Sequence, residues 1–525
     1  MNFANSPGGD MIRRIISLSL LALTPLSAQG EPAVLYATHC AVCHGDDRLG
    51  SLGPALIPES LRRLKGDKLE AVIAQGRIST QMPGFDAQIS AEDITELAAY
   101  LHTPLPEIPV WNAERIAETL EVNPDYVAPD APQHDADPLN IFVVVETGDH
   151  HISVLDGDTF DVLARLPTPL AVHGGPKFTP DGRFTFVMSR DGWVQKIDLW
   201  SMQEVARLRA GVNSRNIAMS KDGKYLAVAN YLPHSLTILS TADMSVERIF
   251  DVVGKDGESS RVSAVYQAPQ RDSFILALKD IPEIWEVATD PKADPVYEGF
   301  VHSREKGMVE AIASSEGLFA RRRIEVTEPL DDFFFTPDYR FLIGAARESD
   351  RGVVVNLNVG RETHELPLSG LPHLGSGISW EYQGRRVMAT PHLREAKLSV
   401  IDIQNWEVLT QIDTDGPGFF MRSHENSPYV WADVFFGPNR DVMHVIDKQT
   451  LEIVKTLRPV PGKTLAHVEF DREGRHALVS LWEDDGAILI YDAQTLEEVK
   501  RLPMSKPSGK YNVFNKITFS DGTSH

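Results

Sequence analysis

The sequence predicts a multidomain chain in which a small all-α domain precedes an all-β eight-bladed propeller. Three observations lead to this prediction. A single Cys-x-x-Cys-His motif lies near the start of the 525-residue chain, which is too long for one ordinary core. The composition changes after Thr103, where proline and aspartate become frequent. From Asn140 onward, a unit of short strands and polar turns recurs, as it does in propellers.

The overall composition is that of a globular protein with many turns. Hydrophobic residues make up 42% of the chain, and it contains 34 prolines and 37 glycines. The formal net charge is -23, which argues against nucleic acid as a partner because phosphate binding needs clustered lysine and arginine. The acidic surface suits either solubility alone or a basic redox partner.

The N-terminus has the pattern of a secretory signal. Arg13 and Arg14 precede an apolar run over residues 15–26, and the small residues Ser27 and Ala28 follow. We therefore expect a signal peptide over residues 1–28, with either Met1 or Met11 as the true start, and a mature periplasmic protein. Nothing later reaches the ~20 apolar residues of a membrane helix, so we expect no membrane span.

The motif residues Cys40, Cys43 and His44 predict one covalent haem c. In a Cys-x-x-Cys-His motif both thiols add to the haem vinyl groups and the histidine gives an axial nitrogen to the iron. These are the only two cysteines in the chain, so a zinc site would lack its further cysteine ligands. A redox pair would need a βαβ context. A disulfide framework is excluded unless the motif is misread.

The segment around the motif resembles the class I cytochromes c over residues 36–101, which predicts a cytochrome c domain over residues 31–103. In that family a methionine from a late loop is the second axial ligand, and the resemblance assigns this role to Met82. His39 and His102 are the alternatives, although His39 is poorly placed because it directly precedes Cys40. Apolar residues at helical spacing predict a terminal helix over residues 90–102. The strings that carry the resemblance are Leu35-Tyr36-Ala37-Thr38-His39, Cys43-His44-Gly45-Asp46, Leu52-Gly53-Pro54-Ala55-Leu56 and Gln81-Met82-Pro83-Gly84-Phe85.

Residues 104–138 are predicted to form a linker, with a short helix near residues 113–120. The propeller is then expected over residues 139–525. Two signatures recur there at intervals of roughly 41 to 47 residues, the length of a four-stranded blade. The first is a strand that ends in Ile or Val plus Asp, as at Asp156, Asp198, Asp402, Asp447 and Asp492, with weaker copies near Ile238, Trp285 and Val355. The second is a turn before an apolar strand, as at residues 179–183, 220–224, 336–340 and 471–475.

Eight copies of the first signature predict eight blades around a central channel, which is a natural pocket. Seven is the alternative count if a weaker copy is not a blade. One interval, between Trp285 and Val355, is longer and holds an insertion over residues 302–323. A helix is possible over residues 308–319. The insertion is compatible with either a lid over the channel or a surface loop.

A cytochrome c domain followed by such a propeller resembles the haem d1 proteins over essentially the whole mature chain. The resemblance implies that haem d1 or dihydro-haem d1 binds in the channel without a covalent bond, with His173 as the proximal iron ligand. Arg190 and Arg215 are then partners of the acidic macrocycle, and His373 lies on the distal side, either as an iron ligand or as a proton donor. The strings that carry the resemblance are Leu170-Ala171-Val172-His173, Ser189-Arg190-Asp191-Gly192, Ile197-Asp198-Leu199-Trp200, Leu371-Pro372-His373-Leu374-Gly375-Ser376-Gly377 and Gly509-Lys510-Tyr511-Asn512-Val513-Phe514-Asn515.

Departures from one branch of this family favour the other. The cytochrome cd1 nitrite reductases have two distal histidines; His373 matches one, but residues 330–332 contain no histidine. Conversely, the reductases have no His at the position of His467 and no Tyr at the position of Tyr511. The resemblance implies that the dihydro-haem d1 dehydrogenases use both of these residues. The resemblance therefore favours an oxidoreductase of the dehydrogenase branch.

That branch oxidises a propionate side chain of dihydro-haem d1 to an acrylate, the last step of haem d1 biosynthesis. His467 is then the candidate base, and Tyr511 donates or accepts a proton or holds the carboxylate. Electrons would leave through the covalent haem to a periplasmic acceptor. The alternatives are nitrite reduction, a non-enzymatic carrier that delivers haem d1 to cytochrome cd1 nitrite reductase, and a propeller dehydrogenase with another cofactor.

Overall fold

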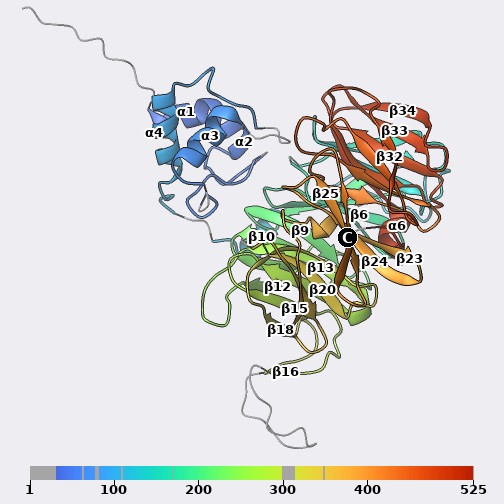
Figure 1. Cartoon of the computed structure of the whole chain (residues 1–525). Helices are drawn as coiled ribbons and strands as arrows, with labels where there is room; N and C mark the ends of the chain where they lie inside the picture. Colours follow the sequence, from blue (N-terminus) through green and yellow to red (C-terminus); the bar gives the residue numbers. More distant parts are fainter. Residues whose placement is uncertain are drawn as a thin grey trace, which may run out of the picture.

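The architecture is visible in a computed structural model of the chain (Figure 1). The structure describes residues 31–51, 53–61, 64–76, 82–107, 110–169, 171–297, 314–346 and 349–523. A small helical domain is followed by a large ring of antiparallel sheets, as predicted. The predicted signal peptide over residues 1–28 lies outside the described residues.

The N-terminal domain packs its helices around an apolar cluster that includes Tyr36, Leu69, Ile73 and Leu97. The last helix begins at the cap residue Ser90, whose hydroxyl accepts a hydrogen bond from the backbone N–H of Asp93. This helix buries the apolar stripe from which the sequence predicted it. The helices are α1 (Pro32–His39), α2 (Ala41–His44), α3 (Asp67–Gln75) and α4 (Ala91–Leu101).

Residues 110–122 attach the segment after this domain to the propeller. They form the expected short helix, α5 (Ala113–Glu118), and a strand, β1 (Glu121–Val122), that pairs with the outer strand β8. Trp111 and Ile116 are buried in one apolar cluster with Leu49 and Ile57 of the helical domain and with core residues of the ring. The helical domain is therefore held against the ring by a shared core.

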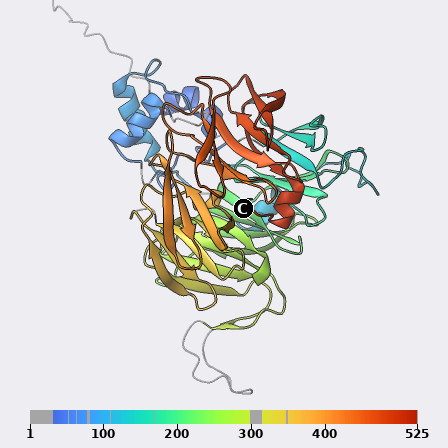
Figure 2. The same ribbon diagram turned by 45° about the vertical axis from the view of Figure 1, so that its right-hand side comes forward.

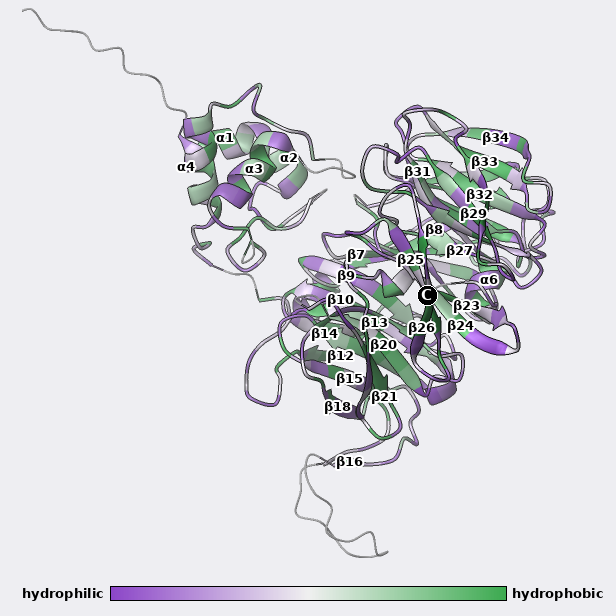
Figure 3. Cartoon of the chain, in the orientation of Figure 1, coloured by the Kyte–Doolittle hydropathy of each residue, from purple (hydrophilic) through white to green (hydrophobic). Residues whose placement is uncertain are grey.

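Eight sheets make up the ring, which confirms the predicted eight-bladed propeller: seven have four strands, and the sheet of β5–β8 has a fifth because β1 pairs with β8. Hydrophobic residues are concentrated along the strands and hydrophilic ones in the loops (Figure 3). Within each blade the strands are antiparallel and follow chain order, apart from the blade that closes the ring.

In the first half of the ring, the blades are β2 (Ile141–Glu146), β3 (His151–Asp156) and β4 (Val162–Pro167) with β35 (Pro507–Asn512); β5 (Lys177–Phe178), β6 (Phe184–Met188), β7 (Trp193–Asp198) and β8 (Gln203–Arg209); β9 (Asn213–Met219), β10 (Tyr225–Leu232), β11 (Ser235–Ser240) and β12 (Val246–Asp251); and β13 (Val262–Ala268), β14 (Ser273–Leu278), β15 (Glu283–Ala288) and β18 (Arg321–Glu325).

In the second half, the blades are β19 (Leu330–Phe335), β20 (Phe341–Ala346), β21 (Gly352–Asn356) and β22 (Arg361–Leu366); β23 (Ile378–Tyr382), β24 (Arg385–Pro391), β25 (Lys397–Asp402) and β26 (Glu407–Asp413); β27 (Met421–Arg422), β28 (Tyr429–Asp433), β29 (Met443–Asp447) and β30 (Ile453–Leu457); and β31 (Leu465–Phe470), β32 (His476–Leu481), β33 (Gly486–Asp492) and β34 (Glu498–Met504).

The two recurring sequence signatures have fixed places in a blade. The Ile/Val-Asp signature ends the third strand, and the turn signature joins the first strand to the second. Between β5 and β6, a carboxylate oxygen of Asp181 accepts hydrogen bonds from the Thr179 hydroxyl and the Arg183 backbone, while Gly182 has a φ of +71°. Such a turn needs an acceptor and a residue that tolerates positive φ, which explains why the pattern recurs.

The ring closes by pairing the last strand of the chain with the first. β35 pairs antiparallel with β2, with Val143 opposite Tyr511. Helix α6 (Val513–Thr518) follows directly and lies near the middle of the ring beside the C-terminus (Figure 2). A propeller closed in this way has no free sheet edge at the point where the chain ends meet.

The long interval between β15 and β18 contains a short hairpin of β16 (Val296–Tyr297) and β17 (Ser314–Ser315). The helix considered for residues 308–319 is wrong over the part that the structure describes, because Ser314 and Ser315 pair as a strand with β16. Cross-strand hydrogen bonds satisfy this backbone instead. Among the described residues, the helices are all too short or too polar to cross a bilayer.

We expect Phe142→Ala to destabilise the propeller by about 3–5 kcal/mol, because it empties a large site in a close-packed core. Phe142 is 0% exposed and lies in the apolar cluster that joins the closing blade to the blade before it. Urea unfolding of the purified protein measures the change. Val162→Ala is the control, since Val162 is 51% exposed on the outer strand of the same blade. Equal losses for both variants would contradict the assignment of Phe142 to the closing core.

Candidate functional site

The Cys-x-x-Cys-His motif folds into a geometry that fits a covalent haem. Cys40 ends α1 and Cys43 lies in α2, so a single tight turn presents both thiols and His44. Both thiols are free in the described structure and both are half-buried. The Nδ1–H of His44 donates to the carbonyl of Pro54 at 2.8 Å, which leaves Nε2 unprotonated to bind iron.

The local environment keeps His44 neutral and fixed. Burial lowers the pKa of His44 below its ordinary value, which favours the neutral form that ligates metal. A Cβ atom at Gly53 would lie 2.4 Å from Cε1 of His44. Only a glycine therefore allows the 53–54 segment to approach the ring closely enough for the Pro54 hydrogen bond.

The second axial ligand stays a prediction. Met82 is half-buried and its carbonyl packs against Gly76, while residues 77–81 lie outside the described residues. Of the two rival histidines, His102 has its Nε2 at 2.8 Å from the Leu64 carbonyl, and its ring is therefore engaged within its own domain. His39 lies edge-on to Phe85, with 5.9 Å between the ring centroids.

Inside the propeller, the predicted residues His173, Arg190 and Arg215 come together at the channel. His173 precedes β5, Arg190 follows β6 and Arg215 lies on β9. The Nδ1–H of His173 donates to the Arg215 carbonyl at 2.8 Å, so Nε2 carries the lone pair. This nitrogen accepts hydrogen bonds from Nη2 of Arg190 at 3.0 Å and from Nη1 of Arg215 at 3.1 Å.

Burial and two neighbouring guanidinium groups keep the imidazole of His173 neutral. Burial is the main cause that lowers the pKa of His173 well below its ordinary value, and the charges of Arg190 and Arg215 lower it further. An unprotonated Nε2 is the form that binds iron, and the guanidinium forks are suited to carboxylates. The geometry thus fits the roles that the resemblance implied for all three residues.

His373 lies in the chain segment before β23. It reaches the channel from the side of the ring opposite His173. Its Nδ1–H donates to the Phe419 carbonyl at 2.7 Å, and the Phe419 ring lies 4.1 Å from its own. Its Nε2 is 3.5 Å from a carboxylate oxygen of Asp332 on β19. Burial lowers the pKa of His373 below its ordinary value. Asp332 also accepts hydrogen bonds from the hydroxyl of Tyr266 and the backbone N–H of Gly375.

His467 sits in a bulge of β31 with a strained backbone. Its φ is +47°, and the pairing with β32 slips between Ala466 and Val468. Its backbone N–H donates to Asp433 at 3.2 Å, and its carbonyl accepts from the ammonium of Lys510 at 2.6 Å. A histidine with positive φ is costly, and such strain is characteristic of functional positions.

The His467 ring is buried without a hydrogen bond. The residue is 1% exposed, and neither Nδ1 nor Nε2 has a partner within the described part of the chain. Phe420 and Tyr511 pack against the ring at centroid distances of 4.8 and 5.3 Å. Burial, and then Lys510, lowers the pKa of His467 well below its ordinary value. Because an orphaned buried polar group is destabilising, the ring is positioned for a bound molecule.

Tyr511 completes this side of the channel from β35. Cβ atoms added at Gly175 and Gly509 would lie 2.9 and 2.3 Å from Cε1 and the hydroxyl oxygen of Tyr511, so two glycines make room for its ring. Burial raises the pKa of Tyr511 to about 12, and the phenol is protonated at neutral pH. The structure therefore brings the predicted residues His467 and Tyr511 into contact.

Sequence reasoning missed the residues that hold these groups in place. Asp433 on β28 accepts from the backbones of Phe419, Phe420 and His467, and burial raises its pKa to about 6. Asp332 and Lys510 are further examples. Lys510 lies in a string that carries the family resemblance, but nothing local marks Asp433, because its partners lie in the segment before β27 and on β31 of the next blade.

A contact between the two domains leads toward the channel. Arg209 ends β8; its Nε donates to the Asp191 carbonyl at 2.7 Å, and its Nη2 lies 3.5 Å from the Leu49 carbonyl of the helical domain. The indole of Trp111 donates to the Arg209 carbonyl at 3.0 Å. Asp191 directly follows Arg190, so the segment that follows His44 is connected through Arg209 to the His173 site.

Comparison with known proteins agrees with this geometry. The model of the Cytochrome D1 heme domain matches residues 136–296 and 304–516. The chain belongs to the Cytochrome D1 heme domain family. The model of subunit III of cbb3-type cytochrome c oxidase matches residues 27–101, which agrees with a covalent haem c in the helical domain.

Several proteins resemble this chain to different extents. The dihydro-heme d1 dehydrogenase of Pseudomonas aeruginosa is 50% identical over 518 residues, which cover 98% of this chain and 100% of that protein. Protein NirF of the same organism is 27% identical over 70% of this chain and 89% of its own. Cytochrome c55X of Stutzerimonas stutzeri is 34% identical over 18% of this chain and 88% of its own.

The solved structure of dihydro-heme d1 dehydrogenase NirN in complex with DHE superposes with a TM-score of 0.79 at 50% identity. The superposition covers 93% of this chain and 100% of that one. The order of the two domains is therefore shared with a dehydrogenase along the whole chain.

We expect Gly53→Ala to disturb the axial ligand without unfolding the domain. The added Cβ overlaps the His44 ring, and overpacking of this kind costs about 1–3 kcal/mol. The visible spectrum of the protein with its covalent haem should show altered ligation or incomplete haem attachment. Gly66→Ala is the matched control, because a Cβ there meets nothing within 4 Å although its φ is +52°. An unchanged spectrum in Gly53→Ala would contradict His44 as the axial ligand.

Proposed function

We propose that this protein is a periplasmic oxidoreductase that converts dihydro-haem d1 to haem d1, the last step of haem d1 biosynthesis. The observation that carries the proposal is the buried His467 ring, which has no hydrogen-bond partner among the described residues and packs against Tyr511 on the same side of the channel. The 50% identity to a dihydro-heme d1 dehydrogenase over almost the whole chain supports it.

The channel binds the macrocycle through groups of its own. His173 offers a neutral Nε2 to the iron from one side, and His373 faces the distal side as a second ligand or a proton donor. Arg190 and Arg215 now donate to the His173 nitrogens; on substrate binding their guanidinium groups turn to the carboxylates of the macrocycle. Desolvation of these charged pairs in the buried channel strengthens their interaction.

The reaction removes two electrons and two protons from a propionate side chain and leaves an acrylate double bond. His467 accepts the first proton, because burial keeps its ring unprotonated at neutral pH. Tyr511, protonated at that pH, donates a hydrogen bond to the carboxylate and holds the side chain against the base. The second proton leaves to solvent.

A covalent haem on Cys40 and Cys43, ligated by His44 and by Met82, supplies a one-electron acceptor when bound. Arg209 and Trp111 hold the segment after His44 against the propeller, which keeps the two redox sites at a fixed separation. The two electrons of each oxidation would leave through this haem one at a time to a periplasmic acceptor, and the product would be handed on to cytochrome cd1 nitrite reductase.

We expect His467→Ala to lower kcat for dihydro-haem d1 oxidation by about 10²–10⁴-fold, the usual contribution of a general base. Tyr511→Phe should lower it by about tenfold, because a hydrogen bond to a charged group is lost. The appearance of haem d1 in the visible spectrum measures both rates. His364→Ala is the control, since His364 is exposed on the outer strand β22.

Two outcomes would contradict the proposal. Oxidation at the wild-type rate in His467→Ala and Tyr511→Phe, with binding retained, would favour a haem d1 carrier. Rapid turnover of nitrite by the protein loaded with haem d1 would favour a nitrite reductase. The absence of a histidine at residues 330–332 and the contact of His373 with Asp332 argue against the second outcome.

The pH profile provides a separate prediction. Burial lowers the pKa values of His173, His373 and His467, and His173 and His467 act as neutral imidazoles. We therefore expect kcat/KM to be constant from neutral pH down to the ordinary histidine pKa of about 6.5 and to fall only at more acidic pH. Steady-state kinetics across this range checks the prediction, and an acidic limb centred at or above 6.5 would contradict it.

A further inference from the structure

The carboxylate of Asp433 joins two chain segments that line the channel. The residue ends β28 and is 1% exposed. Its Oδ1 accepts hydrogen bonds from the backbone N–H groups of Phe419 at 2.8 Å and Phe420 at 2.9 Å. Its Oδ2 accepts from the backbone N–H of His467 at 3.2 Å. One carboxylate therefore binds the segment before β27 and the bulge of β31 at the same time.

Phe419 and Phe420 each contact one of the two histidines on this part of the channel. The Phe419 carbonyl accepts the Nδ1–H of His373 at 2.7 Å, and the centroids of the two rings are 4.1 Å apart. The Phe420 ring packs on the imidazole of His467, with 4.8 Å between the centroids. The two N–H groups that Asp433 binds thus belong to the residues that orient His373 and His467.

The segment of Phe419 and Phe420 is held against Asp433 from both directions. The backbone N–H of Asp433 donates to the Phe420 carbonyl at 3.1 Å, in addition to the contacts of the side chain. A Cβ atom added at Gly418 would lie 2.8 Å from the Asp433 carbonyl oxygen, so this close approach requires a glycine. A displacement of the Asp433 side chain would therefore move both aromatic rings.

The backbone of His467 depends on the same carboxylate. Its φ of +47° is costly and persists only where the surroundings impose it. Asp433 binds the N–H of His467, and the Lys510 ammonium donates to its carbonyl at 2.6 Å. Burial raises the pKa of Asp433 to about 6, which leaves the carboxylate ionised at neutral pH. An ionised acceptor forms stronger hydrogen bonds than a neutral one, so Asp433 is suited to impose this conformation.

We propose that Asp433 is a positioning residue that fixes the spacing between the imidazoles of His373 and His467. The proposal rests on the function proposed above, in which His373 faces the distal side of the macrocycle and His467 removes a proton from its side chain. Both groups must reach one bound molecule at once, and catalysis depends on geometry that is arranged in advance. Asp433 acts through the two histidines and through Phe419 and Phe420.

Asp433→Asn tests the position of both rings in the full-length protein, with its covalent haem reduced and no macrocycle bound. Asparagine has the same shape, but its amide nitrogen cannot accept a hydrogen bond, so the backbone contacts of at least one segment are weakened. With isotope-labelled histidine, we expect the imidazole NMR resonances of both His373 and His467 to shift. Spectra of His373→Ala and His467→Ala assign these resonances.

Gly418→Ala tests the same connection without a change in Asp433. The added Cβ overlaps the Asp433 carbonyl and pushes the Phe419–Phe420 segment away from the carboxylate. We expect the resonances of both histidines to shift in this variant too. Gly418→Ala therefore decides the question if Asp433→Asn does not fold.

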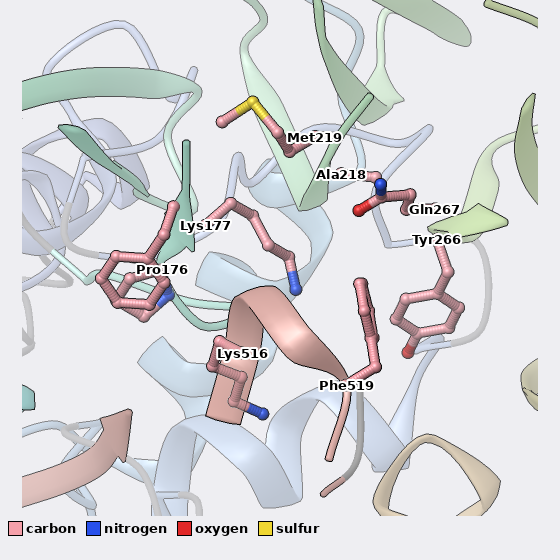
Figure 4. Close-up of a pocket in the computed structure, with 9 residues that line it drawn as sticks. Pro176, Lys177, Ala218, Met219, Tyr266, Gln267, Lys516 and Phe519 are labelled. Carbon is pink, nitrogen blue, oxygen red and sulfur yellow. The ribbon is translucent and has the colours of Figure 1, made fainter. Parts of the chain in front are cut away.

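Tyr266→Phe is a control that disturbs one ring alone. Its hydroxyl donates to Asp332 at 2.9 Å, and Asp332 lies 3.5 Å from Nε2 of His373. Tyr266 comes from β13 and lines a small cavity together with Lys177 and Phe519 (Figure 4). We expect only the His373 resonances to shift, because Asp433 still holds the backbone of His467.

Asp402→Asn is the matched control for the loss of a buried carboxylate. Asp402 is 0% exposed and accepts from the backbone N–H groups of Gln404 at 2.8 Å and Asn405 at 3.1 Å, in the turn between β25 and β26. Neither His373 nor His467 should shift in this variant.

The kinetic arm uses dihydro-haem d1 that is already bound, so unfolded protein does not contribute. We expect Asp433→Asn to lower the single-turnover rate at least about tenfold, because misplaced reacting groups are costly. The affinity for the macrocycle should change by less than about twofold, since His173, Arg190 and Arg215 lie on or beside the blades of β5–β8 and β9–β12. Asp402→Asn should leave both quantities unchanged.

Four outcomes would overturn the proposal. These are an unshifted His373 or His467 in folded Asp433→Asn or, if that variant does not fold, in Gly418→Ala; shifts of both rings in Tyr266→Phe; shifts of either ring in Asp402→Asn; and a wild-type single-turnover rate in Asp433→Asn. If the wild-type protein does not oxidise dihydro-haem d1, the proposed function fails instead. Joint shifts of His373 and His467 would then still support Asp433 as the residue that positions both rings, because the NMR arm needs no turnover.

Discussion

The pairing of β35 with β2 is the constraint on which the rest of this structure depends. It joins residues 507–512 to residues 142–146 and so converts a chain of blades into a closed ring. Closure places Tyr511 beside His467 and positions Lys510 to bind the His467 carbonyl. It also carries α6, with Lys516, into the middle of the ring. Without this one strand pairing, His467 would have neither Tyr511 against its ring nor Lys510 at its carbonyl.

Burial sets the protonation states of the titratable side chains in the closed channel. His173, His373 and His467 are all kept neutral mainly by burial, whereas Tyr511 is kept protonated by the same effect. The two sides of the channel differ in what surrounds the imidazole. Two guanidinium groups contact His173, whereas aromatic rings contact His467. These environments fit the two roles proposed for the imidazoles, iron ligand and base. Iron ligation needs a lone pair near groups that attract carboxylates, and proton abstraction needs a dry, unpartnered base.

The helical domain is coupled to this channel by packing more than by charge. Leu49 and Ile57 share one apolar cluster with Trp111 and the second and third blades, and Arg209 connects the same region to Asp191. An interface of this kind holds a covalent haem at a constant distance from the propeller site. Electron transfer between two sites depends on that distance, and Trp111 and Ile116 contribute to the packing that fixes it.

The sequence by itself determined the features that are local in the chain. Cys40, Cys43 and His44 lie within one helical turn, and the Asp-containing turns recur because each blade needs the same backbone conformation. The eight-bladed ring and the residue types of the site followed from these patterns and from the family resemblance. Tertiary structure alone decided how the site is held together. Asp332 contacts His373 and Asp433 contacts His467 between neighbouring blades, and Tyr511 packs against His467 only because the ring closes. Each of these contacts joins residues on different blades, and no local pattern in the chain records it.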